Sequence, residues 1–93
     1  METFFVYILY SESLNRYYTG YTKDVQKRLD QHNAGRTPST KSGRPWIVAY
    51  TESFWDKSLA SAREAEIKRM KSRHYIESLI KNKNNSSQKI SGG

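Results

Sequence analysis

The chain has 93 residues, which suit a single domain with a modest core and leave no room for a second folded unit. It contains no cysteine, so neither disulfides nor a cysteine-based zinc site can hold it together, and a reducing, cytoplasmic setting is expected. Sixteen Lys and Arg against nine Asp and Glu give a net charge of +7, and the excess falls on residues 23–46 and 57–83. Two basic segments favour a polyanionic partner such as nucleic acid, although solvated lysine-rich surfaces are also common.

Two segments near the N-terminus predict a β-hairpin. Residues 4–10 are aromatic and β-branched, and their near-continuous apolarity is typical of a central strand covered on both faces. This run is too short to span a bilayer and has no basic residue before it, which favours mature structure over a signal peptide. Residues 11–16 are polar, and residues 17–21 again have strong β propensity, so the two strands are expected to pair antiparallel.

The rest of the chain predicts three helices and a third strand. The first helix begins near Val25, with Thr22 or Asp24 as its cap, and ends at Asn33-Ala34-Gly35. The elements that follow are, in order, a cationic loop at 36–45, a strand at 46–51, and helices at 56–69 and 72–83.

The resulting order, ββαβαα, predicts an α+β fold with a three-stranded antiparallel sheet flanked by helices. Residues 1–83 are expected to form this domain. Residues 84–93 are rich in Asn, Ser and Gly and have nothing to bury, so they are expected to be a disordered tail.

Several common catalytic motifs are absent from the sequence. It has no Gly-rich phosphate loop, no His-Glu-x-x-His zinc motif and no serine or cysteine nucleophile motif. Any chemistry must therefore use tyrosine, arginine, histidine and carboxylate side chains.

The tyrosines of the hairpin and the helix after it carry a recognisable pattern. Phe5-Val6-Tyr7 lies in the first strand, Tyr18-Thr19-Gly20 in the second, and Arg28 and His32 on the helix. With Ala60-x-x-x-Glu64 further on, this combination resembles the GIY-YIG nucleases over roughly residues 4–80, and it is similar to their small stand-alone bacterial members. The first motif keeps only its tyrosine, and the second keeps its tyrosine and glycine, which leaves efficient cutting open.

The resemblance implies a nuclease site with one divalent cation, Mg²⁺ or Mn²⁺, held by Glu64. It places Tyr7, Tyr18, Arg28 and His32 around the scissile phosphate, with Tyr7 as the water-activating base and Tyr18 as its orienter. A carboxylate is a suitable hard ligand for such a cation, and an arginine fork suits a phosphate whose charge rises in the transition state.

The implied reaction is metal-dependent hydrolysis of a phosphodiester bond in DNA, with RNA as an open alternative. A domain this small has little surface for reading bases, so structure-selective or weakly nonspecific cutting is expected, in a setting such as DNA repair or recombination. No membrane and no small-molecule cofactor are expected, and a monomer is favoured. The candidate nucleic-acid-binding residues are Gly20, Lys23, Arg36, Lys41 and Arg44.

Ordinary structural roles compete with these assignments. The two tyrosines also suit a core edge, the helix cation and histidine a solvated face, and Gly20 a bulge. Glu64 and Glu66 both flank the apolar stripe of their helix, so periodicity does not choose between them. The second function is therefore a nucleic-acid-binding module that has kept the fold and lost efficient cutting, and the third is a basic protein–protein adaptor.

Overall fold

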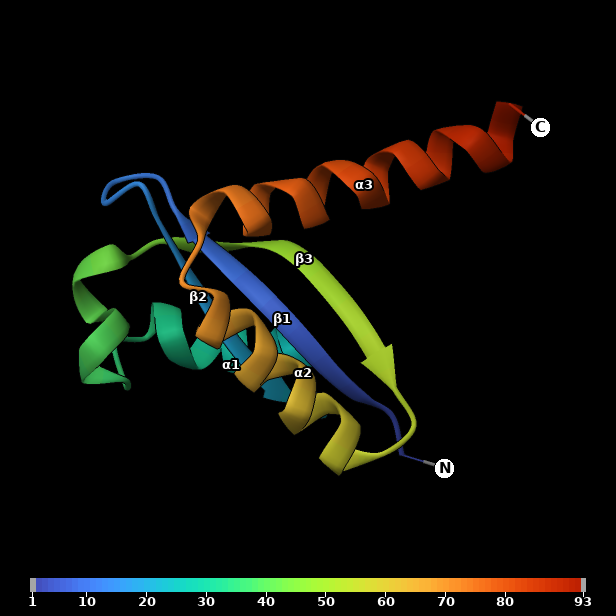
Figure 1. The fold of residues 1–93 in the computed structure, drawn as a ribbon. Coiled ribbons are helices and arrows are strands. Elements are labelled where there is room, and N and C mark those ends of the chain that lie inside the picture. The colour runs from blue at the N-terminus through green and yellow to red at the C-terminus, as the bar shows by residue number, and fades with distance from the viewer. Residues whose placement is uncertain (1, 93) are drawn as a thin grey trace.

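The computed structural model describes residues 2–92, with side chains up to Lys83. Its sheet has three antiparallel strands in the order β2-β1-β3, with bounds β1 Phe4–Ser11, β2 Arg16–Thr22 and β3 Trp46–Phe54 (Figure 1). The continuous apolarity of the first strand predicted its central place, and the strand order confirms it.

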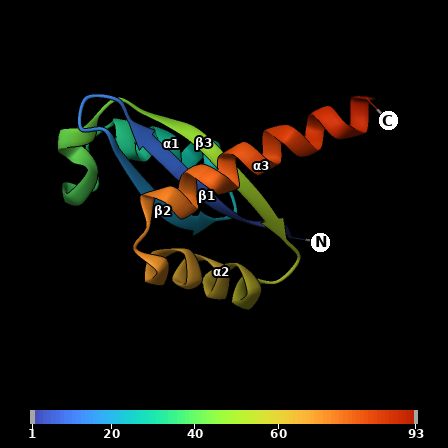
Figure 2. The same cartoon turned by 45° about the horizontal axis from the view of Figure 1, so that its top comes forward.

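Helices cover both faces of this sheet. Helix α1, Val25–Asn33, lies on one face, whereas α2, Lys57–Met70, and α3, Arg73–Gly92, lie on the other (Figures 1 and 2). The α+β class and the order ββαβαα are thus confirmed.

Alternating side chains of β1 contribute to two hydrophobic cores, one on each face of the sheet. Val6 faces Ala60 and Ile67 of α2, together with apolar residues of α3. Tyr7 and Leu9 point to the other face, where Val25 and Leu29 of α1 pack against them. Because strand side chains alternate, this central strand supports both helical layers, and Tyr7 lies on the α1 side.

Side-chain caps set the helix ends much as the sequence predicts. The carboxylate of Asp24 accepts from the backbone N–H of Lys27, so Asp24 is the cap of α1. Asp56 caps α2 in the same way, and the hydroxyl of Ser72 accepts from the N–H of Tyr75 at the start of α3. Helix α2 ends at Met70, and Lys71, its C-cap, has a left-handed φ of 47°.

Three segments differ from the prediction. Helix α3 continues to Gly92, beyond the predicted helix end at residue 83. The cationic loop contains a short 3₁₀ helix, η1 Pro38–Gly43, in which Thr40 and Gly43 are buried. Strand β3 runs to Phe54, three residues beyond the predicted end, because Phe54 still pairs with Phe4 at the start of β1.

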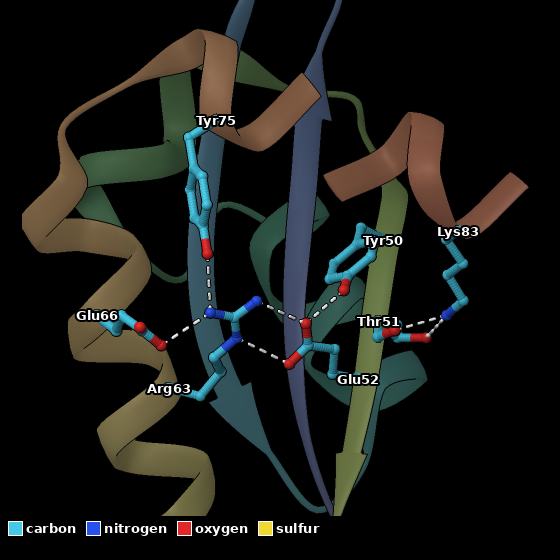
Figure 3. A network of polar contacts seen from close by, with 7 residues as sticks. All are labelled: Tyr50, Thr51, Glu52, Arg63, Glu66, Tyr75 and Lys83. Atoms are coloured by element: carbon cyan, nitrogen blue, oxygen red, sulfur yellow. Dashed lines mark hydrogen bonds and ion pairs between the residues drawn. The ribbon is translucent and has the colours of Figure 1, made fainter. Parts of the chain in front are cut away.

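Arg63 ties the last strand to the two helices on its face (Figure 3). Its guanidinium donates to both carboxylate oxygens of Glu52 on β3, at 2.9 and 3.0 Å. It also donates to Glu66 and to the hydroxyl of Tyr75 on α3. This Arg63 network joins α2 to β3 and α3, and it occupies Glu66 but not Glu64.

Within residues 2–92, no helix combines the length and apolarity that a bilayer span requires. The side chains of residues 84–93 lie outside the described part, so the disordered tail stays a prediction.

Candidate active site

Three aromatic side chains from three elements meet on the α1 face of the sheet. The ring centroids of Tyr18 and His32 are 4.9 Å apart, and Tyr7 lies 6.5 Å from Tyr18 and 6.2 Å from His32. Tyr7 is 1% exposed and His32 is fully buried, whereas Tyr18 is partly exposed. The hairpin and α1 thus gather three of the five predicted catalytic residues in one cluster.

A chain of hydrogen bonds fixes the tautomer of His32. The hydroxyl of Thr40 donates to the carbonyl of Thr37, so it accepts from Nδ1–H of His32 at 2.8 Å. The other ring nitrogen, Nε2, is then an acceptor, and the hydroxyl of Tyr7 donates to it at 3.2 Å. His32 is therefore placed to receive a proton from Tyr7.

Burial keeps both partners of this bond neutral. Burial raises the pKa of Tyr7 above its usual 10, although the neighbouring guanidinium of Arg28 acts to lower it. Burial also lowers the pKa of His32, and the charge of Arg28 adds to that effect. Arg28 thus lies beside the cluster, where its cation favours the phenolate form of Tyr7.

Gly20 leaves the space that the hydroxyl of Tyr7 fills. The two residues are register partners on β2 and β1. A Cβ at Gly20 would lie 2.5 Å from the Tyr7 hydroxyl oxygen and 2.7 Å from the adjoining ring carbon. Regular pairing continues through this position, so the glycine is required by the tyrosine opposite it.

Of the two candidate carboxylates, Glu64 is the one near the tyrosines. Its charge acts on the pKa of Tyr7, and it pairs at 3.1 Å with Lys68, whose ammonium lies 5.9 Å from the centre of the Tyr18 ring. Glu66 instead pairs with Arg63 in the Arg63 network. Through Lys68, α2 therefore reaches Tyr18 on the edge strand β2.

Glu64 offers the site one hard oxygen ligand. Its side chain is 19% exposed, and one of its oxygens contacts the ammonium of Lys68. The described side chains contain no group of three or more His, Cys, Asp or Glu that could hold a metal ion. A lone carboxylate fits a cation that takes its other ligands from phosphate and water, as Mg²⁺ commonly does.

One supporting residue escaped the sequence analysis: Thr40, which holds the ring of His32. The i, i+4 spacing of Glu64 and Lys68 predicts their ion pair, and Lys68 also contacts Tyr18. Asn33, which follows His32 in the family pattern, donates to the carbonyl of Trp46 and accepts from its N–H. These two bonds anchor the end of α1 to the start of β3, as a polar residue at the last position of a helix often does.

The cations predicted to bind nucleic acid fall in two places. Lys23 pairs with Glu2 at 2.8 Å and lies over Phe4, which belongs to the other face of the sheet. Arg44 donates to the carbonyl of Lys41 in the η1 segment and lies against Gly35. Arg36 is exposed after α1. Arg36, Lys41 and Arg44 thus lie around the α1–η1 connection, where Thr40 joins His32 of the cluster.

The fold and the tyrosine–histidine cluster are those of a known family of catalytic domains. The model of the GIY-YIG catalytic domain matches residues 3–90, so this chain belongs to the GIY-YIG family of nuclease domains.

Its relatives are small proteins of the same kind. The UPF0213 protein SH2523 of Staphylococcus haemolyticus is 45% identical over 69 residues, which cover 73% of this chain and 83% of that protein. The UPF0213 protein VNG_2274C of Halobacterium salinarum is 51% identical over 55 residues, which cover 58% and 71% of the two chains. The solution structure of the UPF0213 protein BH0048 from Bacillus halodurans is similar, with a TM-score of 0.56, 35% identity, and coverage of 87% of this chain and 85% of that one.

Proposed function

We propose that this protein is a metal-dependent endonuclease that hydrolyses phosphodiester bonds in DNA, with structure-selective or weakly nonspecific cutting, in DNA repair or recombination. The observation that carries the proposal is the hydrogen bond from Tyr7 to a neutral, oriented His32 beside Arg28 and Glu64. A phenol, a proton acceptor, a guanidinium and a carboxylate are the groups that such hydrolysis needs.

Tyr7 and His32 together can activate a water molecule. Tyr7 gives its hydroxyl proton to Nε2 of His32 and takes a proton from the attacking water. The water oxygen then forms a bond to phosphorus as the bond to the leaving oxygen breaks. Thr40 keeps Nε2 turned toward Tyr7 throughout. Tyr18, in contact with the His32 ring, orients the pair.

Arg28 and Glu64 serve the phosphate. The guanidinium of Arg28 would donate to the non-bridging oxygens, whose negative charge increases in the transition state. Glu64 would hold Mg²⁺ or Mn²⁺ through one carboxylate oxygen in exchange for its contact with Lys68. The bound cation supplies charge for the phosphate and the leaving oxygen.

The decisive experiment compares Glu64→Gln with Glu66→Gln. Supercoiled plasmid and labelled flap DNA are incubated with Mg²⁺, Mn²⁺ or EDTA. We expect metal-dependent cutting by the wild type, a loss of at least about 100-fold in Glu64→Gln, and little change in Glu66→Gln. The second variant is a matched control, because it removes the same charge two residues away on the same helix.

Three outcomes would contradict the proposal. Cutting that persists in EDTA would contradict the proposed metal dependence. Equal losses of activity in the two variants would contradict the assignment of Glu64 as the metal ligand. A wild type that binds DNA in a salt-sensitive manner without cutting would assign the chain to the binding modules.

A further inference from the structure

A groove opens beside the candidate active site, between the outer edge of β2 and the junction of α2 with α3. Its volume is about 400 Å³. The hairpin lines it with residues 15–19, and the end of α2, the start of α3 and the residues between them line it with Ile67, Lys68, Lys71, Ser72, Arg73 and Ile76. We call this hollow the β2–α3 groove.

The lining of the groove is basic. Four cations contribute to it, Arg16, Lys68, Lys71 and Arg73, and no acidic residue does. Arg73 is held by the carbonyl and side chain of Asn15 and by Glu77, which lies beside the groove. Among the described side chains, Arg16 and Lys71 make no ion pair, so their charges stay available to a ligand.

Lys71 is the unexpected member of this set. It ends α2 with a φ of 47°, a left-handed conformation that normally favours glycine. Its side chain contributes no described hydrogen bond or ion pair that would compensate for this strain. Lys71 thus places a charge beside the groove at a position that glycine would fill more easily, so a change to glycine removes the charge without disturbing the helix end.

The groove is continuous with the candidate active site. Tyr18 and Lys68 line it, and the same two residues contact His32 and Glu64. The N-terminus of α3 also opens onto it, with no acidic residue in its first turn. A strand whose phosphate lies at Glu64 would therefore find the basic hollow next along its backbone.

We infer that the β2–α3 groove binds the sugar–phosphate backbone of the nucleic-acid strand on one side of the scissile phosphate, with Lys71 and Arg16 as phosphate contacts. This inference rests on the proposed function for the position of the cut. It adds contacts to those expected from the sequence, which were Gly20, Lys23 and the loop cations Arg36, Lys41 and Arg44.

The test measures binding rather than cutting. A fluorescein-labelled DNA duplex with a single-stranded arm is titrated with protein in EDTA at several salt concentrations, and anisotropy gives the Kd. We expect Lys71→Gly to reduce the slope of log Kd against log[salt] by about 0.7–0.9, one phosphate contact, and to weaken binding about sixfold near 0.1 M salt. Adding Arg16→Gln should reduce the slope by about as much again.

The matched control is Lys57→Ala, which removes the same charge at the opposite end of α2, about 20 Å away along the helix. It should leave the Kd and its salt slope unchanged. Lys71→Gly should keep the unfolding midpoint or raise it, because glycine suits the left-handed position, so weaker binding would not reflect unfolding.

The inference is overturned if Lys71→Gly binds as the wild type does, if Lys57→Ala weakens binding equally, or if the wild type does not bind the probe. Failure of the proposed function is a separate result. If the wild type never cuts DNA but Lys71→Gly still weakens binding, the nuclease proposal is contradicted and the proposed role of the groove in binding is supported.

Discussion

Tyr7 and Gly20 illustrate how closely a single residue can depend on the one opposite. The tyrosine is buried in the central strand, and its hydroxyl lies where a side chain at Gly20 would be. The glycine of the second motif is thus a spatial requirement of the tyrosine of the first. Neither motif alone can form the hydrogen bond to His32, because the side chain of Tyr7 must pass over Gly20 to reach that ring.

Gly20→Ala should damage both the fold and the cutting. The added methyl must displace a buried ring, so we expect a loss of about 1–3 kcal/mol in the free energy of unfolding and at least about tenfold in cutting rate. Urea denaturation and plasmid nicking measure the two effects. In a Tyr7→Phe background the stability loss should shrink, because the closest contact, to the hydroxyl oxygen, is gone. An equal loss in both backgrounds would show that the alanine clashes elsewhere.

At the scale of elements, the Arg63 network holds α2 against β3. Glu52 and Arg63 are 22% and 19% exposed, so their bidentate pair is partly shielded from water. Burial alone would raise the pKa of Glu52, but hydrogen bonds from Arg63 and Tyr50 outweigh it and lower the pKa below 4.5. Burial and the hydrogen bond to Glu52 raise the pKa of Tyr50 to about 12.

Glu52→Gln should therefore destabilise the protein in a pH-dependent way. A carboxylate with a lowered pKa contributes stability above pH 4.5, and loses it as the pH falls through the folded value. We expect a loss of about 1–3 kcal/mol at pH 7 and a smaller difference near pH 3, measured by urea denaturation. The exposed Glu2–Lys23 pair provides the control, and Glu2→Gln should change little at either pH.

Local chemistry made most of the elements predictable. The apolar run of the first strand and the caps at Asp24, Asp56 and Ser72 act within a few residues, so the sequence displays them directly. The burial of Thr40 depends on His32 eight residues away, and a polar loop gives no sign of such a contact.

The residues of the candidate site could be predicted from the family resemblance, but less well from helical periodicity and spacing alone. Helical periodicity left Glu64 and Glu66 equivalent, since both flank the apolar stripe. What separates them is Arg63, whose partner Glu52 lies on another element and takes Glu66 into its own network. A choice made by a tertiary contact cannot be read from the spacing along one helix.

At the scale of the whole molecule, the basic charge can be divided between the domain and the segment that follows Lys83. Among the described side chains of α3, Tyr75, Ile76 and Leu79 pack on the core. The segment 84–93 contributes one charged residue, Lys89, to the net charge of +7. The basic character of the protein therefore resides in the domain itself.

A chain shortened to residues 2–83 should keep both fold and activity. No described core contact is lost, so we expect the midpoint of thermal unfolding to move by less than about 4 °C. Calorimetry and the flap-cutting assay measure the two properties. A large fall in the midpoint would assign residues 84–93 to the folded domain and contradict the predicted tail.

The two strand pairs of the sheet differ in the regularity of their register. Pairing of β1 with β2 runs without a shift from Phe5 to Ser11, whereas pairing with β3 slips by one residue between Ile8 and Leu9. The irregularity thus lies on the side away from the hairpin that aligns the two tyrosines. Insertions and deletions in β3 can be absorbed there during evolution, while the same change in the hairpin would turn a tyrosine to the opposite face.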